Sequence, residues 1–289
     1  MHVQRTMVRR GIVVPALTLA MVAAALGVMA PAQADSGTAR VPGLVRVGNT
    51  SPNNSVGKSV TVNCPGATRV YGSGASINGG GGAVVIDRIT PNLTLTSVQV
   101  TAFEAIPFPG NWSITAYAIC GAATLNLQRI HFTSATNSQN KSVVASCPAG
   151  LRLYGTGAEL NGALGRVSIT GIIPNPGLTA VTVNAVENGP FAGNWSVTGY
   201  AICANPSRIM TRAAASSAIN SVAVKSASAT CPFGTRVHGV GGQVDFGLGN
   251  VHLTDLLPGP FLGASITTAQ ERGLFFGNWR VTSYVICAS

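Results

Sequence analysis

Charged side chains are scarce in this sequence of 289 residues, where Asp, Glu, Lys and Arg together make up only 9%. The 18 basic residues are spread along the chain and form neither a run nor a helical stripe, which argues against nucleic acid as a partner. The low charge does not indicate disorder, because 46% of the residues are hydrophobic and 35 are glycine. This composition is typical of short strands joined by tight turns.

Motifs of common enzyme classes are also absent. The sequence has no GxSxG, no HExxH and no glycine-rich phosphate loop followed by lysine. We therefore predict that the protein is not an enzyme, that it has no catalytic residue and no metal site, and that it uses no cofactor.

The first 34 residues have the pattern of an export signal. Arg5, Arg9 and Arg10 precede an apolar stretch, and Ala32-Gln33-Ala34 supplies the small residues that a signal peptidase requires. An uncleaved membrane anchor is the alternative, because the apolar stretch is nearly long enough to cross a bilayer. Cleavage would leave 15 basic and 8 acidic residues, a net charge of 15 − 8 = +7, and no later membrane span. The prediction is a secreted, extracellular protein of bacterial type.

Cysteine and tryptophan are few, and both recur at fixed spacing. All six cysteines follow the signal, and an even number in an exported chain indicates disulfides. We predict three bridges, each spanning 56 positions: Cys64 with Cys120, Cys147 with Cys203, and Cys231 with Cys287. Each of the three tryptophans stands eight residues before the second cysteine of a pair, as in GNWSITAYAIC, GNWSVTGYAIC and GNWRVTSYVIC.

These spacings show that one unit occurs three times. After the signal and an N-terminal tail at 35–40, the repeats run over 41–121, 122–204 and 205–289. The protein has only three lysines, and each stands six residues before the first cysteine of its repeat. An arginine and a glutamate recur as well, so that the copies act as an internal alignment.

Within each repeat, apolar and polar residues alternate with a period of two. Val60 and Val62 show this early in the first repeat, and Ile114, Ala116 and Ala118 show it late. The pattern predicts about six antiparallel strands per repeat, and no segment has a helical stripe. We expect an all-β sandwich or barrel of about 80 residues around each tryptophan, stapled by its disulfide because so small a domain buries little surface.

Two arrangements of the repeats stay open. The repeats are either independent domains in tandem, which we favour, or the three faces of one closed prism with pseudo-threefold symmetry. The prism is similar to that of vitelline membrane outer layer proteins and some lectins, but only in its threefold repetition.

At the level of the repeat, the CPAG…GNW…AYAIC pattern resembles secreted tandem-repeat β proteins of actinobacteria. The resemblance covers nearly the whole chain after the signal. It implies an exported all-β protein, and it implies no catalytic or binding residue.

The recurring polar and aromatic residues are the candidates for a ligand site. Arg, Glu, Trp and Tyr together suit a carbohydrate, since an aromatic face surrounded by charged hydrogen-bonding groups binds sugars. The structural alternative, which we favour, makes the glutamate a partly buried partner of the arginine or the lysine. The candidates are Arg69, Glu104, Trp112 and Tyr117, then Arg152, Glu187, Trp195 and Tyr200, and finally Arg236, Glu271, Trp279 and Tyr284.

We expect a secreted binding protein that recognises surface polysaccharide or cell-envelope material, with three sites that gain avidity together. One alternative is a structural envelope or matrix protein without a specific ligand. Another is an inhibitor that blocks a secreted protease with the variable loop between Glu and Trp. A catalytic or metal site at His238 and His252, with Asp245 and Asp255 nearby, is the rival class, although the other repeats have no histidine there.

Overall fold

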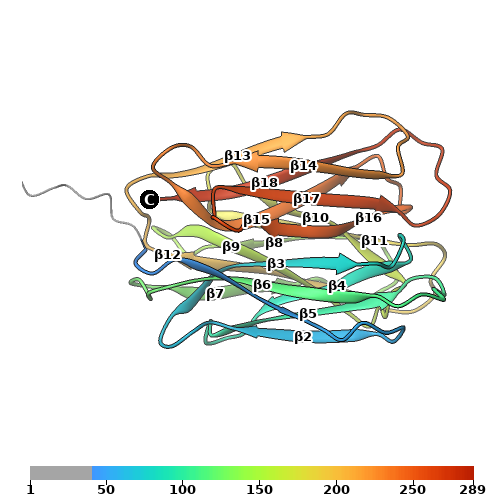
Figure 1. Cartoon of the computed structure of the whole chain (residues 1–289), viewed down its shortest axis with the longest axis horizontal. Coiled ribbons are helices and arrows are strands. Elements are labelled where there is room, and N and C mark those ends of the chain that lie inside the picture. Colours follow the sequence, from blue (N-terminus) through green and yellow to red (C-terminus); the bar gives the residue numbers. More distant parts are fainter. Residues whose placement is uncertain (1–40) are drawn as a thin grey trace, which may run out of the picture. The chain divides into compact units, whose positions relative to one another are not determined.

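The computed structural model describes residues 41–289, which form eighteen β-strands and no helix (Figure 1). The expected signal at 1–34 and tail at 35–40 lie outside the described residues. Each repeat contributes six strands, as the period-two alternation predicts. The all-β class is therefore confirmed.

The strands of the three repeats correspond in order and closely in length. The first repeat holds β1 (Val45–Thr50), β2 (Lys58–Asn63), β3 (Arg69–Asn78), β4 (Val84–Pro91), β5 (Ser97–Glu104) and β6 (Ser113–Gly121). The second holds β7 (Gln128–Thr133), β8 (Lys141–Ser146), β9 (Arg152–Asn161), β10 (Val167–Pro174), β11 (Ala180–Glu187) and β12 (Ser196–Ala204). The third holds β13 (Met210–Ser216), β14 (Val224–Thr230), β15 (Arg236–Asp245), β16 (Val251–Pro258), β17 (Ala264–Glu271) and β18 (Arg280–Ala288).

The strands form three antiparallel sheets of six, and every sheet combines three strands from one repeat with three from another. We name each sheet by its repeats: the 1/3 sheet is β1-β6-β3-β16-β17-β14, the 2/3 sheet is β13-β18-β15-β10-β11-β8, and the 1/2 sheet is β2-β5-β4-β9-β12-β7. In Figure 1, the orange-red strands of the third repeat meet the blue-to-green strands of the first at β16 and β3. The expectation of three independent domains in tandem is therefore wrong, because no repeat forms a complete sheet by itself.

A short seam joins the two halves of each sheet. Only two residue pairs are in register at each seam, between β4 and β9, between β10 and β15, and between β16 and β3. At the β4–β9 seam the pairs are Arg88 with Glu159 and Ile89 with Ala158. Neighbouring strands of the same repeat pair over many more residues than the two at a seam. The seam therefore brings two repeats into contact but adds few backbone hydrogen bonds.

The third strands of the repeats, β3, β9 and β15, approach one another through glycine. A Cβ atom built on Gly155 would lie 2.0 Å from the carbonyl oxygen of Tyr71, and one on Gly72 would lie 2.1 Å from that of His238. The cycle is completed by Gly239, whose Cβ would lie 2.3 Å from the carbonyl oxygen of Tyr154. These distances explain why the glycine after Tyr71, Tyr154 and His238 recurs, since any side chain there would separate the strands.

Three rings pack edge to face beside these glycines. The ring centroids of Tyr71, Tyr154 and His238 lie 5.4 to 5.8 Å apart in all three pairings. Each tyrosine hydroxyl donates to a backbone carbonyl 51 residues later, at Ala122 and Asn205. The three repeats therefore share one buried aromatic cluster.

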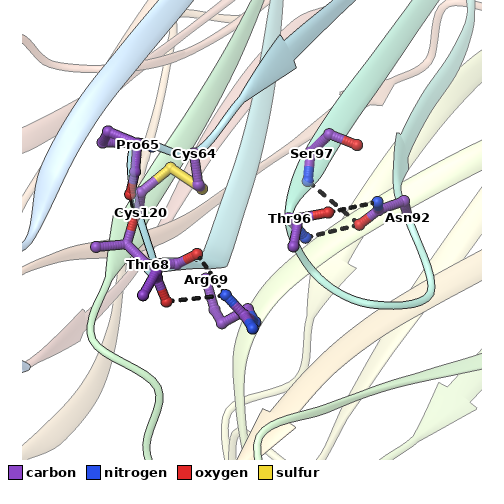
Figure 2. The surroundings of a disulfide bond; sticks show 9 residues. Cys64, Pro65, Thr68, Arg69, Asn92, Thr96, Ser97 and Cys120 are labelled. Atoms are coloured by element: carbon purple, nitrogen blue, oxygen red, sulfur yellow. Dashed lines mark hydrogen bonds between the residues drawn. A yellow bond between two sulfur atoms is a disulfide. The ribbon is translucent and has the colours of Figure 1, made fainter.

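The predicted disulfide pairing is confirmed, and each bridge joins two different sheets. Cys64 follows β2 of the 1/2 sheet and is bonded to Cys120 on β6 of the 1/3 sheet (Figure 2). The bonds Cys147–Cys203 and Cys231–Cys287 repeat this connection between the other sheets. A bridge over such a loop contributes about 4 kcal/mol by restricting the unfolded chain.

The shared sheets predict that a single repeat does not fold alone. We expect residues 41–121 by themselves to show no cooperative unfolding as a monomer, because both of their half-sheets lose the strands of the neighbouring repeats. Residues 41–289 should unfold cooperatively under the same conditions. Circular dichroism during urea titration, with ultracentrifugation to detect self-assembly of the fragment into trimers, provides the measurement. A stable monomeric fragment would contradict this account of the seams.

Candidate functional site

Each tryptophan lies inside a cluster with the recurring lysine and glutamate. In the first repeat the side chain of Trp112 is fully buried, and its indole N–H donates to Glu104 Oε1 at 3.0 Å. Lys58 Nζ lies 3.6 Å from the centroid of the indole ring, and it donates to the carbonyl oxygens of Asn54 and Val56 at 2.7 Å. The lysine therefore holds the loop before β2 against the indole by a cation–π contact.

The same cluster forms in the other two repeats. The indole N–H groups donate to the corresponding glutamates at 2.9 and 2.8 Å, and the lysine ammonium groups lie 3.8 and 3.9 Å from the ring centroids. Burial lowers the pKa of all three lysines, and the nearby glutamate raises it in part. The members are Lys141, Trp195 and Glu187 in the second repeat and Lys225, Trp279 and Glu271 in the third.

The recurring arginine lies apart from this cluster. Arg69 donates to the carbonyl oxygens of Ala67 and Thr68 in its own turn, next to the disulfide (Figure 2). Arg152 likewise donates to a carbonyl of its own turn, and Arg236 donates to the carbonyl oxygen of Leu44. The sequence brings Arg and Glu together as candidate partners, but the glutamate pairs with the indole instead.

The recurring tyrosine contacts a different arginine. The guanidinium carbons of Arg46, Arg129 and Arg212 lie 4.3, 4.8 and 5.0 Å from the ring centroids of Tyr117, Tyr200 and Tyr284. These arginines come from the first strand of each repeat. The twelve predicted residues therefore occupy three separate places in each repeat: the turn at the disulfide, the buried indole cluster and the tyrosine on the sixth strand.

The structure also separates the residues of the rival catalytic hypothesis. His238 lies on β15 of the 2/3 sheet and His252 on β16 of the 1/3 sheet, and both are buried. Asp245 forms an ion pair with Arg280, and Asp255 accepts a hydrogen bond from Ser76. Each of the two aspartates therefore has a partner of its own. No cluster of three metal-ligating side chains is found in residues 41–289.

A polar network crosses the seam of the 1/2 sheet. Arg88 on β4 forms an ion pair with Glu159 on β9, and its guanidinium also donates to Gln99 Oε1 at 3.0 Å. The hydroxyl of Tyr200 donates to the other oxygen of Glu159 at 2.5 Å, and burial with this bond raises the tyrosine pKa. At the aligned seam positions the other sheets have Gly171 with Gln243 and Asp255 with Ser76, so only this sheet has an ion pair there.

Asp87 lies beside this network, at a bulge where the register of β4 against β5 shifts between Ile86 and Arg88. Asp87 is only 5% exposed, and its Oδ1 atom has no hydrogen-bond partner among the described residues. Burial raises the pKa of this carboxyl to about 7, an effect that Arg88 reduces and Glu159 increases. The other repeats have Thr170 and Thr254 at this position.

Unpartnered polar atoms gather on this one sheet. Seven buried side-chain nitrogen or oxygen atoms lack a hydrogen bond in residues 41–289, and four of them belong to Asp87, Arg88, Thr90 and Arg129 of the 1/2 sheet. Buried polar groups are normally satisfied, so these four atoms require an explanation.

A groove of about 320 Å³ opens at Asp87 and Arg88. Ser59, Gln99 and Thr101 line it from the first repeat, and Asn161 and Leu164 line it from the second. It therefore presents hydroxyl, amide and carboxyl groups beside apolar side chains. The groove was not predicted because it exists only where two repeats meet. Its one sequence signal is that Asp87 and Glu159 each break the internal alignment.

The variable loop before each tryptophan exposes different side chains in the three repeats. Leu274 and Phe276 in the third repeat are 91% and 88% exposed, whereas Phe108, Phe191 and Phe275 pack against the core. Exposed large apolar side chains of this loop are thus concentrated in the third repeat.

Comparison with known proteins assigns no function to these sites, because no protein family model and no curated protein matches the chain. Within the described residues, no helix is long and apolar enough to span a membrane. The three disulfides are consistent with an oxidising, extracellular compartment.

The indole cluster predicts a specific loss of stability in a Glu104→Leu variant. This change removes the acceptor of a buried indole N–H, and we expect the free energy of unfolding to fall by about 2 to 4 kcal/mol. A Glu104→Gln variant keeps an oxygen acceptor and should lose less. Guanidinium denaturation of both variants measures the difference, and equal losses would show that the hydrogen bond is not the source of the stability.

Asp87 predicts a characteristic pH dependence. Its pKa is about 7 in the folded protein and 3.8 in the unfolded chain, so between these values only the unfolded chain loses its proton. The free energy of unfolding is therefore unaffected by this group below pH 3.8 and falls progressively as the pH rises through 7. An Asp87→Asn variant should therefore gain stability relative to the parent between pH 4 and pH 8, by up to about 4 kcal/mol. Urea denaturation across this range is the test. The buried histidines are present in both proteins, so a difference that stays constant with pH would contradict the shifted pKa.

Proposed function

We propose that this is a secreted, non-catalytic binding protein that recognises surface polysaccharide through the outward face of the 1/2 sheet. The observation that carries the proposal is the groove on that sheet, which is lined by hydroxyl, amide and carboxyl groups from two repeats. A saccharide offers many hydroxyl groups, each of which both donates and accepts hydrogen bonds. Such a ligand can form several hydrogen bonds at once with a groove lined by groups of these kinds.

The proposal moves the binding surface away from the tryptophans. All three indoles have 0% exposure and their N–H groups are already bonded, so they offer no face for a sugar ring to stack on. Three of the groove residues, Asp87, Arg88 and Gln99, have no counterpart of the same type in the other repeats. We therefore propose one site per chain in place of three equivalent sites.

We further propose that the three sheets are the faces of one closed, pseudo-threefold prism. The cyclic sharing of strands and the mutual approach of β3, β9 and β15 support this arrangement. A closed ring of sheets supports the site, because the seam holds residues from two repeats in a fixed register. Preformed sites of this kind lose little entropy when a ligand binds.

Binding to a panel of soluble and insoluble polysaccharides tests the proposed function. We expect at least one polysaccharide to bind, and we expect Gln99→Ala and Asn161→Ala to weaken its affinity about 5- to 20-fold by removing one hydrogen bond each. Thr182→Ala is the matched control, because Thr182 occupies the position of Gln99 on the 2/3 sheet. Pull-down and isothermal titration calorimetry supply the measurements.

Two outcomes would overturn the proposal. A blank result over the whole panel favours the alternative of a structural envelope or matrix protein without a specific ligand. Binding that Thr182→Ala weakens as much as Gln99→Ala would show that the surface lies elsewhere.

A further inference from the structure

Asp87 brings a carboxyl group to a place where the fold does not need one. The two aligned residues are threonines, whose hydroxyls hydrogen-bond locally: Thr170 to the carbonyl oxygen of Asn184 and Thr254 to Asp255 Oδ2. A small hydroxyl side chain is therefore sufficient at this bulge. The carboxyl of Asp87 is instead buried in the wall of the groove with its Oδ1 atom unpartnered among the described residues, which costs stability in the free protein.

Arg88, the adjacent positive charge, forms no ion pair with Asp87. The guanidinium of Arg88 is engaged by Glu159 in an ion pair and by Gln99 in a hydrogen bond. Among the residues that line the groove, Asp87 is the one acidic and Arg88 the one basic residue, and only Arg88 has a partner of opposite charge, Glu159.

We propose that the groove beside Asp87 binds a protonated amino group, so that the recognised polysaccharide contains amino sugars with free amines. This inference rests on the proposed function, since it specifies the ligand of the same site. A sugar hydroxyl would give the Asp87 oxygen a donor but would leave its charge uncompensated. An ammonium group supplies both the donor and the opposite charge, which is what a buried carboxylate requires.

The remaining groove residues suit the rest of an amino sugar. Ser59, Thr101 and Asn161 provide hydrogen-bonding groups for ring hydroxyls. Leu164 is 69% exposed at the edge of the groove, where it can contact the apolar C–H face of the ring. No other groove residue is acidic, so Asp87 is the one lining residue whose charge attracts an amine.

Two hexasaccharides that differ only in acetylation provide the test. We expect the glucosamine hexamer to bind at least about 10-fold more tightly than the N-acetylglucosamine hexamer in calorimetry at pH 6, where the amines are protonated. Because Asp87 must lose its proton to pair with ammonium, binding of the glucosamine hexamer should also release protons. Titrations in two buffers of different ionisation enthalpy count them.

The variants Asp87→Asn and Asp87→Thr should lose both the preference and the proton release, while they keep the weaker binding of the acetylated hexamer. Asp87→Thr introduces the residue that the other two repeats have at this position. Because threonine fits the bulge there, a loss of binding in this variant would not result from a local packing defect. Circular dichroism confirms the fold of both variants.

Equal affinity for the two hexamers, or a preference that survives in both variants, would overturn the amine assignment and leave polysaccharide binding intact. Failure of both hexamers to bind overturns it as well. The panel of polysaccharides described above then decides separately whether the proposed function fails with it.

Discussion

The close approach of β3, β9 and β15 is the constraint on which the rest of the structure depends. Backbone meets backbone at Gly72, Gly155 and Gly239, and no side chain fits between these strands and the neighbouring carbonyl oxygens. Contact at this distance lets each repeat pair its fourth strand with the third strand of another repeat. The sheets are thereby shared in a cycle, and each disulfide then links two of them at a point away from the seam.

This arrangement constrains the residues of the interior more tightly than the residues on the sheet faces. Each indole cluster lies within one repeat and holds the same loop in each, so its lysine, glutamate and tryptophan recur without exception. A seam position faces a residue from a different repeat, so one substitution alters one face only. Arg88 with Glu159 occurs on the 1/2 sheet alone for this reason, and the faces have become chemically distinct although the repeats align without a gap between their cysteines.

Short-range patterns in the sequence were sufficient to predict the strands and the bridges, because alternation and spacing are local properties. The six strands per repeat and all three cysteine pairs are confirmed. The partner of each strand was not predictable in this way, since a period of two does not record which repeat lies across a seam of only two residue pairs. The same limit applies to Glu104: it was expected as a partly buried partner of Arg69 or Lys58, but only the fold shows that its hydrogen-bond partner is an indole N–H. Asp87 and Glu159 were visible as departures from the internal alignment, yet they are distant in sequence and meet only in the folded chain.

A buried carboxyl without a partner persists only where the surrounding structure can bear its cost. Three bridges, each worth about 4 kcal/mol, give this scaffold a reserve that a domain of similar size without disulfides does not have. Asp87, at the bulge, and Arg88 line the same groove, within a strand that is paired along both edges. The carboxyl is thus held in place in the free protein, and in the proposed complex neutralisation by the ligand would remove the penalty that folding imposed. Stability given up at the seam would then be recovered as affinity, which is the physical reason to propose the site on this face and not at the fully satisfied indoles.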